Sequence, residues 1–229
     1  MNAIILAAGR GERMRPLTDT VPKPLLEAGG KPLIAWHIEK LAAAGCTRIV
    51  VNYAHLGAAI EAALGDGARF GVEIVYSPER EALEAAGGIA NALPLLGDAP
   101  FAAVNADVYS DYDYALLAQS VAQLAPPAPP AHLVLVDNPA HHPQGDFALN
   151  GSLVALHGAL LTYSGIAAYR PEFFTAVEHG SKAALAPLLR EQIARKRVSG
   201  EHFSGRWMDV GTPERLRALR RELAAGQGL

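Results

Sequence analysis

A loop near the N-terminus carries residue types that bind phosphate. Gly9 and Gly11 directly follow an apolar segment, where glycines let backbone N–H groups approach phosphate oxygens. The same loop holds Arg10, Arg13 and Arg15, and Lys23 follows between two prolines. Guanidinium groups bind phosphate through paired hydrogen bonds, and a fixed ammonium adds a point charge. The pattern predicts a triphosphate-binding site.

Other glycine motifs do not fit this loop. The dinucleotide-binding pattern requires a third glycine where Met14 stands. A P-loop that ended at Gly30 and Lys31 would begin with glycine, where Leu25 stands. It would continue with serine or threonine, where Pro32 stands. The remaining alternative is a glycine turn with solvated arginines, but the apolar segment before it and Pro-Lys-Pro after it favour the phosphate site.

Two carboxylates have the surroundings of cation ligands. Asp107 comes just after an apolar segment that ends at Asn105, and Asp209 lies between apolar neighbours in the sequence WMDVG. A lone buried carboxylate is costly, so Asp209 needs a partner. Magnesium bound by one or two carboxylates and by substrate phosphates would satisfy both side chains. The structural alternatives are a turn residue for Asp107 and a residue that only leads into a helix for Asp209.

The elements that position these residues alternate between strand and helix through residue 124. Apolar segments predict strands at residues 2–8, 48–53, 72–76 and 101–105, and helical patterns fall at residues 32–45, 55–64 and 89–95. This alternation predicts an α/β fold with a mostly parallel, Rossmann-like central sheet flanked by helices. The loops after Ala8, Tyr76 and Asn105 should then meet at the carboxyl edge of the sheet, where such folds bind ligands.

The second half has a different pattern. A proline-rich connector, APPAPPA, starts at Ala125, and strands are predicted at residues 132–137, 148–156 and 160–169. Helices are predicted at residues 172–178 and 184–196, and a last helix has Thr212 as its N-cap and Pro213 at its first position. We expect one domain over residues 1–229, in which this half completes the sheet.

Composition restricts the possible partners and location. Of the 229 residues, 50% are hydrophobic and 19% charged, which is a globular composition. A net charge of −3 does not indicate a nucleic-acid surface, and the apolar run from Ala3 to Ala8 is too short to cross a membrane. The single cysteine, Cys46, excludes an intramolecular disulfide. We expect a cytoplasmic protein with no nucleic-acid or membrane partner.

The motifs together resemble a known enzyme family. The blocks LAAGRGERMRPLT, PKPL and GKPLI within residues 6–34 closely resemble the signature of the sugar-1-phosphate nucleotidyltransferases. Later blocks at residues 83–89, 95–107 and 207–216 are similar to short bacterial members. The resemblance implies the nucleotidyltransferase fold, Mg²⁺ as cofactor, and UTP and a sugar 1-phosphate as substrates. The sugar phosphate would attack the α-phosphorus and release pyrophosphate.

The resemblance also implies roles for individual residues. Residues 1–124 would form the nucleotide-binding half and residues 132–229 the sugar-binding half. Arg13, Lys23 and Asp107 would be catalytic, and Asp107 and Asp209 would hold the metal. The predicted nucleotide-binding residues are Ala8, Gly9, Gly11, Glu12, Arg13, Lys23, Gly88 and Asn105. The predicted sugar-binding residues are Asp146, Ser164 and Gly165, with Lys182 as a further candidate.

Several features depart from the family pattern or leave alternatives open. Larger members carry a second phosphate-binding lysine that has no counterpart here, and Ala106 replaces the usual glycine before the metal-binding aspartate. The alternatives are a mannose- or glucose-1-phosphate enzyme that uses GTP or dTTP, and a regulator that binds sugar nucleotides without catalysis. The sequence allows a monomer or a small homo-oligomer. We expect the His141–His142 pair in a solvated loop, and the basic residues from Arg215 to Arg221 on the solvated face of the last helix.

Overall fold

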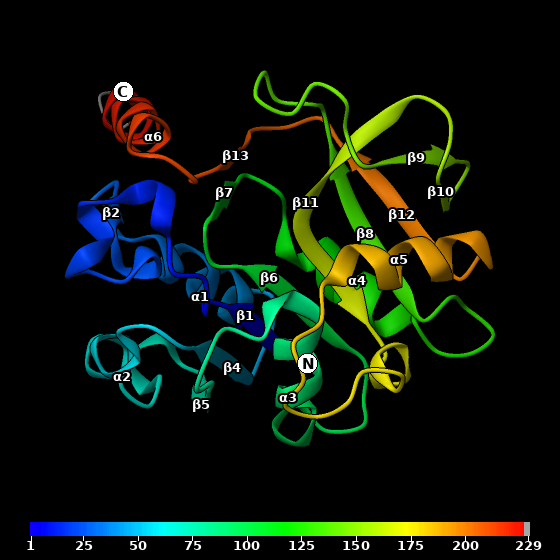
Figure 1. The fold of residues 1–229 in the computed structure, drawn as a ribbon, viewed down its shortest axis with the longest axis horizontal. Helices are drawn as coiled ribbons and strands as arrows, with labels where there is room; N and C mark the ends of the chain where they lie inside the picture. The colour runs from blue at the N-terminus through cyan, green and yellow to red at the C-terminus, as the bar shows by residue number, and fades with distance from the viewer. Residues whose placement is uncertain (227–229) are drawn as a thin grey trace.

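The computed structural model describes residues 1–226, and its centre is one nine-stranded sheet (Figure 1). The strand order is β5-β4-β1-β6-β11-β8-β12-β10-β9. The first four of these strands are mutually parallel, as the sequence predicts. They are β1 (Asn2–Leu6), β4 (Arg48–Tyr53), β5 (Glu73–Pro78) and β6 (Phe101–Asn105).

The second half of the chain extends the same sheet with mixed strand directions. β11 runs antiparallel to both β6 and β8, whereas β12 runs parallel to β8. The strands are β8 (Ala131–Val136), β9 (Phe147–Asn150), β10 (Leu153–Ala155), β11 (Leu160–Tyr169) and β12 (Val198–Phe203). The predicted α/β class is confirmed.

Helices cover both faces of the sheet, and successive strand residues therefore enter different cores. Ala3 and Ile5 of β1 pack in one core with α1 (Leu33–Ala43), α2 (Gly57–Leu64) and α4 (Tyr114–Gln123). Ile4 faces the other core, which includes α3 (Glu84–Leu96) and α5 (Leu185–Ala194). Burial on both faces explains why the strand segments are almost continuously apolar.

Two small ladders lie outside the main sheet. β2 (Glu27–Ala28) pairs with β3 (Lys31–Pro32), and β7 (Val108–Ser110) pairs with β13 (Trp207–Asp209). The last helix, α6 (Pro213–Gly226), lies near β2 and β13 (Figure 1). Its leucine stripe packs against Met14 of the glycine loop, so the C-terminal helix supports the loop predicted to bind phosphate. The stripe consists of Leu216, Leu219 and Leu223.

Some predicted elements differ from the structure. The helix predicted at residues 172–178 is a single 3₁₀ turn, Pro171–Phe174, because consecutive residues Phe173 and Phe174 are both buried. The strand predicted at 148–156 is the β9–β10 hairpin, since Gly151 adopts a positive φ of 61° at its turn. Helix α3 begins at Glu84, well before the predicted start, and includes both glycines of the AAGG sequence. β12 was not predicted, because polar residues interrupt its sequence VSGEHF.

Short 3₁₀ turns complete the described chain, including three in the N-terminal loop. These are Glu12–Met14, Leu17–Asp19 and Lys23–Leu25, with a further turn at Ala68–Phe70. Within residues 1–226, no helix combines the length and the apolar character needed to cross a membrane.

Candidate active site

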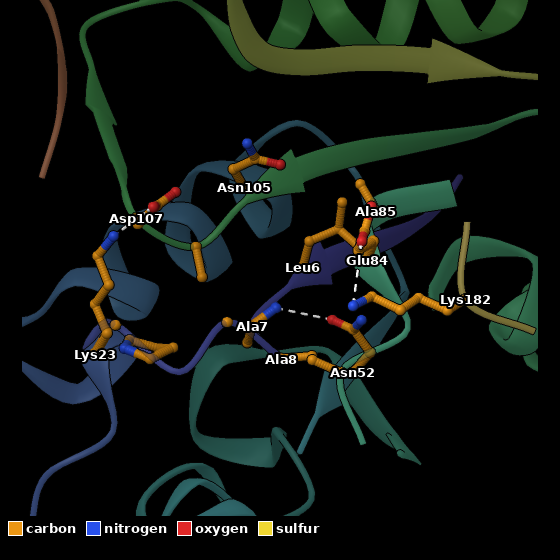
Figure 2. Close-up of a pocket in the computed structure, with 15 residues that line it drawn as sticks. Leu6, Ala7, Ala8, Lys23, Asn52, Glu84, Ala85, Asn105, Asp107 and Lys182 are labelled. Carbon is orange, nitrogen blue, oxygen red and sulfur yellow. Dashed lines mark hydrogen bonds and ion pairs between the residues drawn. The ribbon is translucent and has the colours of Figure 1, made fainter. Parts of the chain in front are cut away.

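A cavity of about 350 Å³ opens at the carboxyl edge of β1 and β6. Figure 2 shows Lys23 and Asp107 on one side of it and Asn52, Glu84 and Lys182 on the other. This is the edge at which the sequence predicts ligand binding. The lining residues come from the end of β1, the glycine loop, the Lys23–Leu25 turn, β4, the end of β6 and the segments leading into α3 and α5. They are Leu6, Ala7, Ala8, Gly9, Gly11, Lys23, Pro24, Asn52, Ala82, Glu84, Ala85, Asn105, Ala106, Asp107 and Lys182.

The glycine loop turns sharply at the cavity wall. Gly11 has a φ of 64°, and a Cβ built there would lie 3.0 Å from Cγ2 of Thr18 and 3.3 Å from Cβ of Lys23. The hydroxyl of Thr18 donates a hydrogen bond of 2.8 Å to the Gly11 carbonyl and holds this turn. Position 11 therefore requires glycine for both its conformation and its close packing. The side chains of Glu12 and Arg13 are exposed just beyond the turn.

Lys23 and Asp107 form an ion pair on the cavity wall. Nζ of Lys23 lies 2.5 Å from Oδ2 of Asp107 (Figure 2). Only 8% of Lys23 is exposed, and its 3₁₀ turn follows Pro22, which fixes the path of the chain. Asp107 comes from a different element, since it follows the end of β6. Two residues that are distant in sequence thus supply one cation and one carboxylate to the same wall.

The β7–β13 ladder brings Asp209 close to Asp107. Asp209 pairs with Val108 across this ladder, and the Val210 N–H donates a hydrogen bond of 2.7 Å to the Asp107 carbonyl. Backbone pairing therefore makes neighbours of the two carboxylate residues that the sequence singles out. Figure 1 shows β13 as a link between β12 and α6 that passes beside β7.

Asp209 is already paired with basic side chains. Its Oδ1 accepts from Nη1 of Arg215 at 2.8 Å and lies 2.8 Å from Nε2 of His141. His141 lies in an exposed loop, as expected, and also contacts Asp209. The expectation for Arg215 was wrong, because its side chain turns back from α6 toward β13 and is only 16% exposed. The neighbouring His142 also has a partner, Asp146, at 3.1 Å. Arg215 lies six residues from Asp209 in the sequence and His142 four residues from Asp146, whereas the contact of His141 with Asp209 joins two distant segments.

The carboxylate pair fits a hard divalent cation. Within residues 1–226, no cluster of three or more histidine, cysteine, aspartate or glutamate side chains could hold a metal by itself. Asp107 and Asp209 carry carboxylate oxygens on neighbouring backbone segments, and Asp107 lines the cavity. Mg²⁺ is commonly bound by one or two carboxylates with substrate phosphates and water in the remaining positions. The donor set therefore matches Mg²⁺ and not a closed protein-only site.

Asn105 stands between the two halves of the sheet. It ends β6, and a Cβ built on Gly165 of β11 would lie 2.6 Å from its Nδ2. Gly165 has a φ of 77° and lies where the β11–β8 register shifts, between Tyr163 and Ala167. Its lack of a side chain makes room for Asn105 at the cavity.

The opposite wall is organised by Asn52, which sequence reasoning missed. Its Oδ1 accepts from the Ala7 N–H at 2.8 Å, and its Nδ2 donates to Oε1 of Glu79 at 2.7 Å. Burial raises the pKa of Glu79 above its ordinary value. Gly88 lies against this pair, because a Cβ built there would fall 2.6 Å from Nδ2 of Asn52. The available signal was a polar residue inside the apolar strand sequence RIVVNY.

The two polar residues predicted to bind sugar make hydrogen bonds within the fold. Ser164 is 1% exposed, and its hydroxyl donates to the Val134 carbonyl at 2.7 Å and accepts from the Ile166 N–H at 3.1 Å. Asp146 accepts from the Tyr163 N–H at 2.8 Å. The structure does not bring either residue to the cavity lining. Lys182 does line it and lies 3.4 Å from Glu84.

Comparisons with known proteins agree with this geometry. The profile of the Nucleotidyl transferase family matches residues 2–145. The chain is 54% identical to the N-acetylmuramate alpha-1-phosphate uridylyltransferase of Neisseria meningitidis serogroup B, with 95% of this chain and 96% of that protein covered. It is 36% identical to the protein of the same name from Caulobacter vibrioides, with 97% and 96% covered. The fold matches a putative glucose-1-phosphate thymidylyltransferase from Bacillus anthracis with a TM-score of 0.86 at 20% identity, covering 97% of this chain and 95% of that one.

Proposed function

Since the chain belongs to the nucleotidyl transferase family, we propose that it transfers UMP from UTP to N-acetylmuramate α-1-phosphate. The products are the UDP-sugar and pyrophosphate, and the reaction serves peptidoglycan recycling in the cytoplasm. The observation that carries the proposal is the 54% identity with a uridylyltransferase over 95% of the chain. The Lys23–Asp107 pair at the cavity supports it, because the reaction needs both charges there.

The attacking group needs no general base. A phosphate monoester has its second pKa near 6, so the sugar phosphate is mostly a dianion at neutral pH. Catalysis then consists of holding two anionic reactants together and neutralising the charge that develops at phosphorus. This chemistry requires positioned cations and N–H donors, which are what the cavity offers.

The N-terminal half holds the nucleotide in this proposal. The backbone N–H groups from Gly9 to Glu12 and the guanidinium of Arg13 bind the β- and γ-phosphates. Lys23 bridges the reacting phosphates from its partly buried position. Ala8, Gly88 and Asn105 form the surroundings of the nucleoside, with Gly88 acting through the Asn52–Glu79 pair that it packs against.

Asp107 and Asp209 would hold Mg²⁺. When bound, the cation supplies positive charge that neutralises the α-phosphate. The β7–β13 ladder contributes by placing Asp209 opposite Val108, the residue that follows Asp107. Lys23 neutralises Asp107 in the structure, and Arg215 does the same for Asp209.

The second half selects the sugar in this proposal. Gly165 offers backbone groups next to Asn105, and Asp146 and Ser164 act by fixing the backbone around β11. The small-molecule substrates are the only partners required, and a monomer or a small homo-oligomer satisfies the mechanism.

A substrate panel tests the proposal. UTP, GTP and dTTP are each combined with N-acetylmuramate, glucose and mannose 1-phosphates, with and without Mg²⁺, and pyrophosphate release is measured. We expect Mg²⁺-dependent turnover to be fastest with UTP and N-acetylmuramate 1-phosphate. Turnover with another pair but not with this one would overturn the specific assignment. Absence of release with every pair would favour the non-catalytic alternative.

A further inference from the structure

Arg215 contacts Asp209, one of the two carboxylates assigned to the metal, although its sequence context suggests a solvated helix face. It belongs to the first turn of α6, and its side chain is only 16% exposed. Nη1 reaches Oδ1 of Asp209 at 2.8 Å and also contacts Nε2 of His141. Nε of Arg215 is buried, with no hydrogen-bond partner among residues 1–226. The fold therefore leaves part of the hydrogen-bonding capacity of this guanidinium unused.

A second guanidinium lies beside it. A Cβ built on Gly211 would fall 2.4 Å from Nη2 of Arg215 and 3.2 Å from Nη2 of Arg13. Both guanidinium groups thus approach the same small volume, which only a glycine at position 211 leaves open. Arg13 reaches it from the glycine loop and Arg215 from α6. Two elements from opposite ends of the chain place like charges together.

The charges of this cluster call for an anion. Asp209 compensates one of the two guanidinium groups, and Lys23 is compensated by Asp107. The remaining positive charge favours an anion, which would interact with the exposed guanidinium of Arg13 and the mostly buried one of Arg215. Arginine pairs bind phosphate through several parallel hydrogen bonds. The cluster has the composition of a phosphate-binding site.

We propose that Arg215 is a second phosphate-binding arginine, which acts with Arg13 on the β- and γ-phosphates of the nucleotide. On substrate binding, Arg215 exchanges its Asp209 partner for phosphate oxygens of the group that leaves as pyrophosphate. The inference rests on the proposed nucleotidyl transfer.

The test compares Arg215→Gln with a matched control on the same helix. Arg217→Gln removes a guanidinium that pairs with Glu214 on the surface of α6. Pyrophosphate binding is measured by calorimetry with and without Mg²⁺, together with the KM values for UTP and for the sugar phosphate. We expect Arg215→Gln to weaken pyrophosphate binding about tenfold and to raise the KM for UTP by a similar factor. The KM for the sugar phosphate should change less than about twofold, and Arg217→Gln should match the wild type.

Three results would overturn the assignment. One is unchanged pyrophosphate binding and UTP KM with a lower melting temperature, which would mean that Arg215 only supports the fold. Another is a raised KM for the sugar phosphate alone, which would place Arg215 at the other substrate. The third is a wild-type protein that does not bind pyrophosphate. If Arg215→Gln does not fold, Arg215→Lys undergoes the same measurements, with weaker pyrophosphate binding expected because the paired hydrogen bonds are lost.

Pyrophosphate binding also separates this inference from the proposed function. A protein that binds pyrophosphate through Arg215 but turns over no sugar phosphate would retain the phosphate site and lose the proposed reaction. A protein that turns over UTP and N-acetylmuramate 1-phosphate equally well with Arg215→Gln would retain the reaction and lose the assignment.

Discussion

The two halves of the sheet use their polar side chains differently. In the parallel half, the side chains of Lys23, Asn105 and Asp107 lie along the cavity, and Asn52 both lines it and braces the nearby Ala7 backbone. In the mixed half, Asp146 and Ser164 brace the backbone themselves.

This difference follows from strand direction. Parallel strands end at one edge, so residues just past their carboxyl ends gather around a common opening. Strands that alternate in direction send their ends to both edges, and polar residues within them must find partners inside the sheet. A polar residue in a family-like motif is therefore a stronger candidate ligand when it follows a parallel strand than when it lies within an antiparallel one.

The largest expected effect comes from Asp107→Asn. The amide keeps an oxygen for Lys23 but loses the negative charge, so we expect kcat to fall by at least about 10²-fold with little change in the free energy of unfolding. Steady-state kinetics and urea unfolding measure the two quantities. Asp111→Asn is the control, because Asp111 is an exposed carboxylate that pairs with Arg206 nearby. Comparable losses of activity and stability in Asp107→Asn would make the aspartate structural and break the comparison.

His37 provides the next largest effect, and it acts on stability. This residue of α1 lies beneath β7, where Nε2–H donates to the Val108 carbonyl at 2.6 Å and Nδ1 accepts from the Tyr114 hydroxyl at 2.7 Å. Burial lowers the pKa of His37 to about 4. The unfolded chain, with a histidine pKa near 6.5, therefore binds a proton that the folded protein excludes.

The resulting stability is fully present above pH 6.5 and is lost as the pH falls toward 4. We expect His37 to contribute up to about 3 kcal/mol to this loss. Urea unfolding of wild type and His37→Gln at several pH values between 7 and 4 measures it: the stability difference between them should narrow as the pH falls. A difference that stays constant over this range would rule out the neutral, buried histidine.

Ser164→Ala has the smallest expected effect and tests the mixed half. The change leaves the Val134 carbonyl and the Ile166 N–H without their partner, so we expect a loss of about 2 kcal/mol in the free energy of unfolding. The KM for the sugar phosphate should change less than about twofold. Ser120→Ala, on the exposed face of α4, serves as the control for removal of a hydroxyl. A raised KM without lost stability would mean that Ser164 binds sugar after all.

The parallel half was predictable from the sequence because its signals are local. An uninterrupted apolar run predicts a strand buried on both faces, and the strand direction then predicts which edge receives Gly9 and Asp107. The contact of Lys23 with Asp107 agrees with the shared site predicted for them.

The residues that were missed depend on contacts that the periodicity of one segment does not reveal. Arg215 sits one position before the buried Leu216, and helical periodicity alone cannot show that the first turn of α6 faces β13. His141 lies in a loop whose path is fixed by the fold around it. Asn52 lies within strand β4, so its sequence position indicates only a strand. Its role depends on a hydrogen bond to the backbone of Ala7, just after the adjacent strand β1.

The β7–β13 ladder also determines when during synthesis the site is completed. All residues of the main sheet have been synthesised once Phe203 has been added, whereas Asp209 and Arg215 are added later. A nascent chain thus contains the whole sheet before it contains the second carboxylate. The proposed enzyme remains inactive until α6 is synthesised and docks, so a chain that stopped after β12 would contain every strand of the main sheet but neither Asp209 nor Arg215.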